Sequence, residues 1–340
     1  MIYELSNTSI AEHLFAGIDD SMVRSCLQGM MGGKIYVTDP VAPKAAMAFL
    51  AEFAFFAGEP DRELASFKPE GVVGLVPPDD RWSALIEECW PDVPPVTRYA
   101  IKKGTKFDRR KLEAIVSSLP AGYELRRIDG ELYDACLEDE DFEDNVMHFA
   151  SREEFLALGR GFAILKDGEL ISAASSYTAY REGIEVQIYT EEEYRRKGLA
   201  SVACAALILS CMDDGLDPSW DAANTESVHL AEKLGYEFSR EYPTYWLEEV
   251  FDRLISDPDT SEWDAFCGRY QHPEDARRIY EIIKKDDRLY YHFVNPDNGM
   301  VFDLRMYPIG EKTFGINDDD FELVFSDNCL TLDGLVCKKL

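Results

Sequence analysis

The sequence predicts an α/β (α+β) protein in which a mixed central sheet flanked by helices is preceded by an α/β N-terminal half and followed by a small antiparallel β barrel or sandwich. Three observations support this fold class. The 340 residues are enough for two or three domains, at roughly 100 to 200 residues per domain. Strand-like and helix-like runs alternate up to residue 249. Beyond it, short β-like runs follow one another, separated by turn residues.

Residues 1–120 are expected to form an N-terminal α/β domain. Lys34 to Thr38 has the pattern of a short strand, and Pro43 to Phe53 that of a helix with proline at its start. The alternation continues through four further runs: Arg62 to Phe67, Gly71 to Val76, Trp82 to Trp90 and Val96 to Ile101. A polar stretch and a helix to Leu119 then connect this domain to the next.

Residues 121–249 repeat the alternation more clearly. A strand at Tyr123 to Ile128, helical segments from Glu131 to Leu158, and a hairpin from Phe162 to Thr178 come first, and Asp167-Gly168 is a strong hairpin turn. The remaining elements are a strand at Gly183 to Thr190, a helix from Gly198 to about Asp213, a strand at Ser219 to Ala223, a helix at Ser227 to Lys233 and a strand near Tyr242 to Leu247.

Residues 250–340 are predicted to be an antiparallel β domain. Its β-like runs are Leu289 to Val294, Met300 to Tyr307, Thr313 to Ile316, Glu322 to Phe325 and Cys329 to Lys338. Arg277 to Lys285 is ambiguous between helix and strand, and the following Asp286-Asp287 favours a strand that ends in a hairpin turn.

Composition and charge exclude several kinds of protein. With 65 acidic residues against 35 lysines and arginines, the formal net charge is -30, which makes nucleic acid a poor partner. The charge serves either solubility alone or the attraction of a cationic substrate.

The eight cysteines show no CxxC pair and no metal-ligand spacing, so no metal is expected. No secretory segment opens the chain, and the longest apolar run, from Leu199 to Met212, is too short for a bilayer of ~30 Å. We expect a cytoplasmic protein with no membrane partner.

A strand, a tight turn and a helix occur together in residues 185–200. Backbone N–H groups from Arg195 to Ala200 would converge at the N-terminus of the helix predicted from Gly198, where unpaired donors and the helix dipole favour a phosphate group. Gly198 allows close approach of the backbone, and Arg195-Arg196-Lys197 adds positive charge. The segment therefore predicts an anion site.

A companion segment downstream runs from Trp220 through Asn224 and Ser227 to Leu234-Gly235-Tyr236, again a strand leading into a capped helix that ends at a glycine. With both segments present, the sequence resembles the GNAT acetyltransferase superfamily. That superfamily combines an Arg/Gln-x-x-Gly-x-Gly/Ala loop, here Arg195-x-x-Gly198-x-Ala200, with an Asn-led helix ending in Leu-Gly-aromatic. The resemblance assigns the catalytic domain to residues 121–249.

The fuller pattern looks most like the GNAT subgroup associated with zwittermicin A resistance. Patches at Lys44 to Ala46 and Phe55 to Pro60 look similar to the N-terminal half of that subgroup. Residues 1–120 are accordingly interpreted as a degenerate GNAT-like half. The module after residue 249 looks similar to lipocalin-like β domains, and a pocket for the acceptor, self-association into a homodimer, and binding of a small apolar ligand all remain open as its role.

The resemblance implies acetyl-CoA as cofactor and direct attack of a neutral amine on its thioester. Amides of Arg196 to Ala200 would hold the pyrophosphate, main-chain groups of Ile188 and Thr190 would pair with the pantetheine arm, and Asn224 would hydrogen-bond it. The full predicted cofactor set is Ile188, Tyr189, Thr190, Arg195, Arg196, Lys197, Gly198, Leu199, Ala200, Asn224 and Ser227.

This chemistry needs a base for the ammonium proton and an acid for the departing thiolate. Glu185, on the strand that borders the cofactor, is the predicted base. Many GNAT members have a tyrosine as the acid where this chain has Ala231, so the acid is open. Tyr245 is nominated, and Tyr242, Ser227, His229 or a water are alternatives.

The leading hypothesis is an acetyl-CoA-dependent N-acetyltransferase for an amine-bearing small molecule, with antibiotic resistance through acetylation of an amine-containing antimicrobial as its expected role. The alternatives are acetylation of a protein or peptide amine, and a non-catalytic acyl-CoA-binding regulatory protein.

Overall fold

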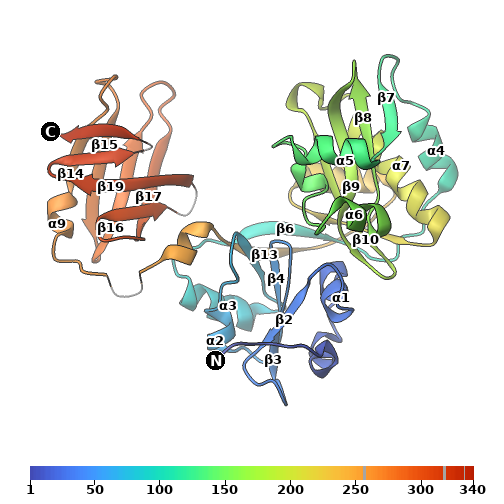
Figure 1. The fold of residues 1–340 in the computed structure, drawn as a ribbon, viewed down its shortest axis with the longest axis horizontal. Coiled ribbons are helices and arrows are strands. Elements are labelled where there is room, and N and C mark those ends of the chain that lie inside the picture. Colours follow the sequence, from blue (N-terminus) through green and yellow to red (C-terminus); the bar gives the residue numbers. More distant parts are fainter. Residues whose placement is uncertain (256–257, 317–318, 333) are drawn as a thin grey trace. The chain divides into compact units, whose positions relative to one another are not determined.

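The computed structural model describes residues 1–255, 258–316, 319–332 and 334–340, which divide into two compact units (Figure 1). The first comprises Met1–Phe67, Gly74–Trp90 and Pro94–Tyr245, and the second comprises Lys68–Val73, Pro91–Val93 and Trp246–Leu340. The first unit contains two sheets and the second contains one closed barrel. The α/β class with a C-terminal antiparallel barrel is thus confirmed, whereas a boundary at residue 120 stays a prediction.

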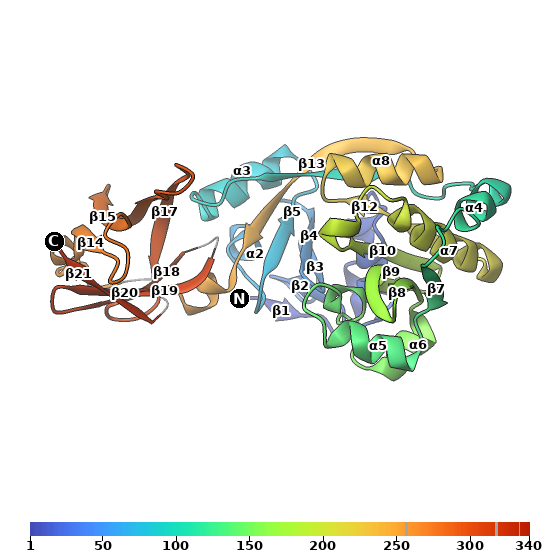
Figure 2. The ribbon, with the colours of Figure 1, turned by 90° about the horizontal axis from the view of Figure 1, so that it is seen from above.

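An eight-stranded sheet of the first unit is built from both ends of that unit. In the order β1-β2-β3-β4-β5-β13-β6-β12, its strands are Tyr3–Glu4, Lys34–Val37, Ala45–Leu50, Phe53–Gly58, Val73–Val76, Phe238–Leu247, Val96–Ile101 and Asp221–Ala222. Strands β12 and β13, from late in the sequence, pair with the two sides of β6 (Figure 2). Residues beyond 220 therefore complete a sheet that begins at the N-terminus.

One prediction in this sheet is wrong. The expected helix at Pro43 to Phe53 is strand β3, which turns at Ala51 (φ 52°) into β4. Five of the six β3 residues are buried, and helix α1 (Ser21–Leu27), which the sequence analysis missed, packs against the strand. A strand covered on both faces loses its alternating pattern, and an alanine-rich run then has the composition of a helix.

The second sheet of this unit has the order β11-β10-β9-β8-β7. Its strands are Asp217–Ser219, Gly183–Thr190, Glu169–Tyr180, Gly161–Lys166 and Glu124–Arg127. The predicted hairpin turn is confirmed, with Asp167 and Gly168 at φ 54° and 92°, and β10 has its predicted bounds. The single strand expected at Ser219 to Ala223 is instead two, because β11 and β12 join different sheets.

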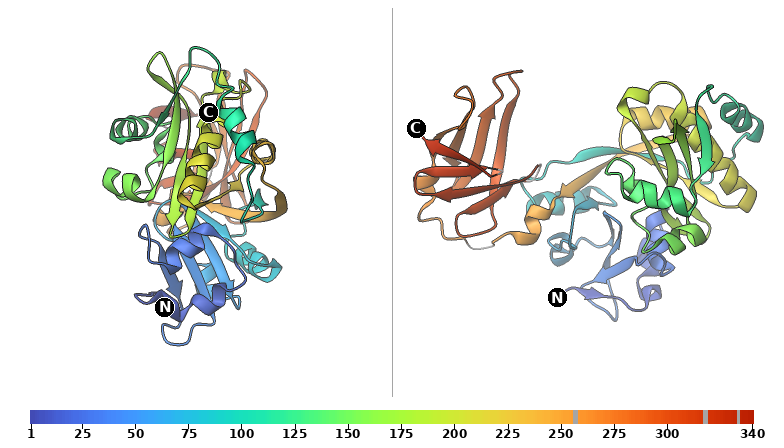
Figure 3. Two further views of the ribbon diagram at one scale, coloured as in Figure 1. Left: turned by 90° about the vertical axis from the view of Figure 1, so that its right-hand side faces the viewer. Right: turned by 45° about the horizontal axis from the view of Figure 1, so that its top comes forward.

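Helices flank these sheets. They are α2 Arg62–Ala65, α3 Asp80–Cys89, α4 Arg109–Val116, α5 Gly130–Leu137, α6 Arg152–Leu158, α7 Leu199–Asp214 and α8 Thr225–Leu234. Helix α7 packs against β8, β9 and β10, and ten of its residues are buried. Helix α1 contacts β3 of the larger sheet and β9 and β10 of the smaller one, so it lies between the two sheets (Figure 3). None of the helices in the described part of the chain is long and apolar enough to cross a membrane.

The second unit is a closed antiparallel barrel (Figures 1 and 3). Its strands β14 to β21 are Gly268–Gln271, Ile279–Lys285, Arg288–Val294, Val301–Pro308, Thr313–Ile316, Asp319–Ser326, Cys329–Leu332 and Leu335–Lys339, preceded by helix α9 (Trp263–Phe266). The strand favoured at Arg277 to Lys285 is confirmed as β15, with Asp286 and Asp287 in the left-handed conformation of a tight turn. The run predicted at Cys329 to Lys338 is a hairpin of two strands around residue 333, which lies outside the described residues.

We expect Gly183→Ala to destabilise the first unit. Gly183 begins β10, and a Cβ at this position would lie 2.1 Å from the carbonyl oxygen of Asp217 on β11. The backbone must therefore shift, at a cost on the order of 3 kcal/mol. Chemical denaturation measures the loss.

Gly17→Ala is the matched control, because nothing lies within 4 Å of a Cβ there, and it should change the free energy of unfolding by no more than about 0.5 kcal/mol. Equal stability of the two variants would contradict the close approach of β11 to β10.

Candidate functional site

The smaller sheet opens at one edge. Strand β10 pairs in parallel with β11 only from Gly183 to Glu185. Strand β12 then pairs with β6 of the other sheet, so in the described part of the chain the register leaves Val186 to Thr190 paired with β9 alone. A β-bulge between Glu185 and Val186 marks the point of separation. One edge of β10 thus presents backbone donors and acceptors to whatever enters the opening.

The predicted anion cradle lies at the end of this open strand. Gly198, at φ 85°, precedes α7, and no side chain caps that helix among the described residues. Arg196 also has a left-handed backbone, with φ 63°. Arg195 donates from Nε to the carbonyl oxygen of Thr190 at 3.0 Å, which ties the loop to β10. The first N–H groups of α7 are therefore directed outward without a side-chain partner.

The side chains around the cradle differ in exposure. Arg195, Arg196 and Lys197 are exposed, whereas Leu199 is buried under the first turn of α7. The Lys197 ammonium lies 4.4 Å from the centroid of the Tyr194 ring. Gly198 and Ala200 are half-buried, and both are too small for a side chain of theirs to fill the turn. Among the described residues, nothing lies within 4 Å of the position that a Cβ at Gly198 would take. The loop thus places positively charged side chains around a turn that is formed by small residues.

The predicted residues of β10 are anchored on its paired side. Tyr189 packs edge-on against Phe142, with ring centroids 5.1 Å apart. Ser172 of β9 donates to the carbonyl oxygen of Tyr189 at 3.1 Å and lies 2.7 Å from the Thr190 hydroxyl. Ile188, between them, is half-buried. The strand is held in place from β9 and leaves its other edge unpaired.

Asn224 and Ser227 combine a structural role with an available group. The Asn224 side-chain oxygen caps α8 by accepting from the Ser227 N–H at 2.9 Å. The Ser227 hydroxyl accepts a hydrogen bond from Trp220 Nε1 at 3.1 Å. The cap fixes the orientation of the Asn224 side chain and uses only its oxygen, so its NH₂ group remains a potential donor.

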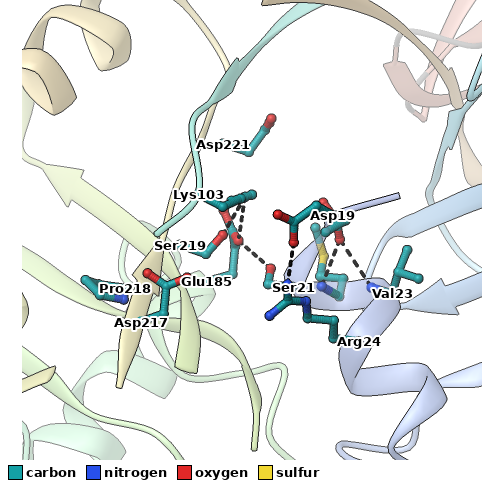
Figure 4. A network of polar contacts seen from close by, with 12 residues as sticks. Asp19, Ser21, Val23, Arg24, Lys103, Glu185, Asp217, Pro218, Ser219 and Asp221 are labelled. Carbon is teal, nitrogen blue, oxygen red and sulfur yellow. Dashed lines mark hydrogen bonds and ion pairs between the residues drawn. The ribbon is translucent and has the colours of Figure 1, made fainter. Parts of the chain in front are cut away.

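Glu185 is buried, only 4% exposed, and lies where β10 separates from β11. Its Oε2 accepts a hydrogen bond from Ser21 of α1 and lies 3.8 Å from the Lys103 ammonium, which itself donates to Ser219 (Figure 4). Its Oε1 has no hydrogen-bond partner among the described residues. One oxygen of the carboxylate is held in place and the other remains available to accept a hydrogen bond.

A second ion pair adjoins Glu185 from the larger sheet. Arg98 of β6 binds Asp221 of β12, with Nε and a terminal nitrogen 2.9 and 2.8 Å from the same carboxylate oxygen. The Arg98 guanidinium lies 4.9 Å from the centroid of the Phe53 ring. Tyr242 of β13 hydrogen-bonds both members of the pair. We call Asp20, Arg98, Lys103, Glu185 and Asp221 the charged cluster.

Electrostatics couple the members of the charged cluster. The pKa of Asp20, the N-cap of α1, is raised to about 6, chiefly by burial and also by the charges of Glu185 and Asp221, against the opposing effect of Lys103. Burial alone would lower the pKa of Lys103, but the surrounding carboxylates raise it, Glu185 most strongly. Lys103 is therefore positively charged at neutral pH. Three carboxylates face two cations, so the charged cluster is short of one positive charge.

Of the remaining predicted residues, Tyr245 lies apart from this cluster. Its hydroxyl donates to Glu87 of α3 at 2.7 Å, and burial raises its pKa to about 12. No contact between described residues joins it to Glu185. Ala231 is buried and His229 is exposed on α8.

The sequence analysis identified Glu185 but missed the groups around it. Asp20, Ser21, Arg98 and Lys103 come from residues before the predicted catalytic domain. Asp20 before Ser21 is an N-cap signal that would have located α1. The described residues contain no group of three His, Cys, Asp or Glu side chains arranged to hold a metal ion.

Comparisons with known proteins agree with this geometry. The family model described as GNAT acetyltransferase matches residues 12–245. A Bacillus subtilis (strain 168) protein named as the uncharacterized N-acetyltransferase YdfB is 28% identical over 242 residues, which are 66% of this chain and 90% of that protein.

Solved structures are also similar. The crystal structure of a GCN5-related N-acetyltransferase-like protein from Streptococcus suis 89/1591 is 42% identical, with a TM-score of 0.66, and covers 71% of this chain and 98% of that one. A Drosophila protein with a TM-score of 0.51 and 13% identity, covering 73% of this chain and 98% of its own, shows similarity of fold alone. The family model ends before the barrel begins.

We expect Asp20→Asn to stabilise the protein at neutral pH. Asparagine caps a helix as well as aspartate does, and it removes a charge that burial disfavours. Since the folded-state pKa of Asp20 is raised from 3.8 to about 6, the stability of the wild type falls as pH rises through this range. The gain of the variant should be absent near pH 4 and reach on the order of 2 to 3 kcal/mol above pH 6. Denaturation between pH 4 and 8 measures it.

Asp108→Asn is the control. Asp108 caps α4 through the same two backbone contacts but is exposed, so its substitution should bring no pH-dependent gain. A gain for Asp20→Asn that does not vary with pH would show that the buried charge is not its cause.

Proposed function

Because the chain belongs to the GNAT acetyltransferase family, and is therefore an acyltransferase, we propose that it transfers the acetyl group of acetyl-CoA to an amine of a small molecule. The observation that carries this proposal is the Glu185 carboxylate, buried where β10 and β11 separate, with Oε1 unpartnered among the described residues. A buried acceptor beside an open strand edge suits the removal of a proton from an amine as it attacks.

We propose that the cofactor follows the open edge of β10. Main-chain groups of Ile188 and Thr190 pair with the pantetheine arm as an added strand would, with Tyr189 between them. The pyrophosphate lies at the N-terminus of α7, against the backbone of Arg196 to Ala200. The NH₂ group of Asn224 donates to the pantetheine arm, and Ser227 supports that orientation through the cap.

In the proposed reaction the acceptor transfers a proton from nitrogen to Glu185 Oε1. The nitrogen lone pair attacks the thioester carbonyl carbon, a C–N bond forms, and the C–S bond breaks as the tetrahedral intermediate collapses. The nitrogen loses its second proton in this collapse, and that proton replaces the one that the acid gives to the leaving sulfur. The products are free CoA and an amide, with the first proton on Glu185. Ser21 and Lys103 stabilise the ionised carboxylate through Oε2 before the transfer.

For the acid that protonates the sulfur we propose Tyr242 in preference to Tyr245. Tyr242 contacts Asp221 and Arg98 of the charged cluster, and burial raises its pKa well above the usual value, so it retains its proton. The Tyr245 hydroxyl is bonded to Glu87 instead. We choose Tyr242 because it contacts Asp221, which interacts electrostatically with Glu185.

The charge of the site supports a cationic acceptor. The charged cluster lacks one positive charge, and the chain as a whole has a formal net charge of -30, so an ammonium group is attracted on approach. We therefore favour aminosugars and polyamines over peptides, with protective acetylation of an antimicrobial, as in the zwittermicin A resistance subgroup, as the biological role.

We also propose a location for the protein and an origin for its N-terminal and C-terminal parts. The eight cysteines are free thiols in the structure, which supports a cytoplasmic location. We keep residues 1–120 as a degenerate GNAT-like half and the barrel as a lipocalin-like module.

We expect Glu185→Gln to lower kcat on the order of 10²- to 10⁴-fold, because glutamine keeps the shape of the side chain but cannot take up the proton. The assay is free-thiol release from acetyl-CoA with a panel of aminosugars, polyamines and amino acids. The Kd for acetyl-CoA should not change. Glu182→Gln, at an exposed position next to β10, is the control and should retain full activity.

Undiminished amine-dependent release by Glu185→Gln would exclude Glu185 as the base. Tight acetyl-CoA binding by the wild type without release for any amine would instead favour a non-catalytic acyl-CoA-binding protein.

We expect Gly198→Val to raise the Kd for acetyl-CoA at least tenfold. Gly198 has φ 85°, which a β-branched residue adopts only with strain, and the new side chain would occupy the turn that receives the pyrophosphate. Gly215→Val imposes similar strain at the other end of α7, where φ is 70°. Isothermal titration should show weaker binding for the first variant only, and equal effects of the two would argue against a cofactor site at residue 198.

A further inference from the structure

Two buried oxygen atoms without partners lie opposite each other on neighbouring strands. Thr178 of β9 is paired with Glu185 of β10 in the antiparallel register, one residue before the bulge. The side chains are 1% and 4% exposed. Thr178 Oγ1 and Glu185 Oε1 both lack a hydrogen-bond partner among the described residues.

This juxtaposition points to a ligand that donates to both atoms. Residues directly opposite in an antiparallel pair direct their side chains to the same face, with Cβ atoms about 4.5 to 5.5 Å apart. A single buried polar atom without a partner costs about 1 to 3 kcal/mol, and here two adjoin. The Thr178 hydroxyl, which can accept as well as donate, is bonded to no described residue. Because Ser21 and Lys103 both approach Oε2, neither supplies the donor that Oε1 lacks.

The charge of the surroundings selects the kind of donor. Asp20, Glu185 and Asp221 outnumber Arg98 and Lys103 by one charge, and Asp217 adds a further negative charge that acts on Lys103. A neutral donor such as a hydroxyl would satisfy the hydrogen bonds but leave the charge uncompensated. An ammonium group satisfies both requirements.

We propose that Thr178 Oγ1 and Glu185 Oε1 form an amine seat, in which the acceptor binds as a primary ammonium ion before it reacts. This inference rests on the proposed function and adds to it a residue that selects the acceptor. One N–H of the ammonium donates to each oxygen, and the proton donated to Glu185 is the one that is transferred. Thr178 holds the nitrogen by a hydrogen bond while the lone pair of that nitrogen turns to the thioester.

The amine seat defines a substrate class. A primary ammonium has three N–H groups, two for the amine seat and one left over, and after loss of one proton the nitrogen still donates to Thr178. A tertiary ammonium has a single N–H and a quaternary ammonium has none, so neither can bridge the two oxygens. The acceptor is therefore a primary aliphatic amine, or a secondary one whose two N–H groups make the same bridge, and hydroxyl compounds are poor acceptors.

The test is the binding of n-propylammonium chloride, a minimal primary ammonium, measured by isothermal titration with CoA present. Removal of the hydroxyl in Thr178→Val should weaken binding about tenfold, as expected for a hydrogen bond to a charged group. Thr178→Ser should restore binding to within about threefold of the wild type. The wild type should not bind 1-propanol, which has the same chain but no charge.

Thr244→Val is the matched control. Thr244 is also fully buried, with an unpartnered hydroxyl among the described residues, but it lies on β13 and not opposite Glu185. Its substitution should leave propylammonium binding unchanged, which separates the amine seat from a general effect of losing a buried hydroxyl. Equal binding by wild type and Thr178→Val, or no binding by the wild type, would overturn the proposal and leave a water as the occupant.

Turnover gives a second and separate readout. With propylamine as acceptor, Thr178→Val should raise KM about tenfold, whereas Glu185→Gln lowers kcat. If the wild type acetylates amines but Thr178→Val does so with an unchanged KM, the amine seat is wrong and the proposed function stands. If the wild type binds propylammonium through Thr178 and acetylates no amine, the proposed function fails and the amine seat remains as a binding site.

Discussion

The short pairing between β10 and β11 is the constraint on which the rest of the site depends. Only three residues of each strand pair, after which the chain crosses to the larger sheet as β12. A longer pairing would close the edge of β10 and leave no unpaired backbone groups there. It would also remove Asp221 from β6 and Arg98. The crossing of the chain from β11 to β12 therefore leaves the smaller sheet open at one edge and joins it to the larger sheet.

The charged cluster lies where the two sheets of the first unit join, and burying its charges there costs free energy. Removing several charged groups from water is expensive, and their mutual attraction compensates for it only where each is paired and hydrogen-bonded. Arg98 and Asp221 meet this condition with two contacts. Glu185 meets it at one oxygen and not at the other. An incompletely satisfied carboxylate in an otherwise paired network is the arrangement expected at a site that acts on a ligand.

How far the sequence predicts the structure depends on how local the determining contacts are. The turn at Gly198 before α7, the hairpin at Asp167-Gly168 and the cap at Asn224 are set by neighbouring residues, and all were located from the sequence. Strand β3 was misassigned because its burial comes from α1, whose contact with it is tertiary. The partners of Glu185 escaped prediction for the same reason, since Ser21 lies 164 positions away in the chain. No periodicity in a single sequence encodes such a pairing.

The origin of those partners bears on which part of the chain can act alone. Ser21, Arg98 and Lys103 precede residue 121, and β6 separates β12 from β13 in the larger sheet. A fragment of residues 121–249 would retain Glu185 and Asp221 but neither of the cations that compensate them. It would also expose the edges of β12 and β13 that pair with β6. Whatever the ancestry of the N-terminal segment, the electrostatics of the charged cluster make it part of the same unit as residues 121–245. The barrel, by contrast, has its own core of aromatic rings, such as Phe266 stacked on Phe325 at 4.4 Å, and contributes no member of the charged cluster.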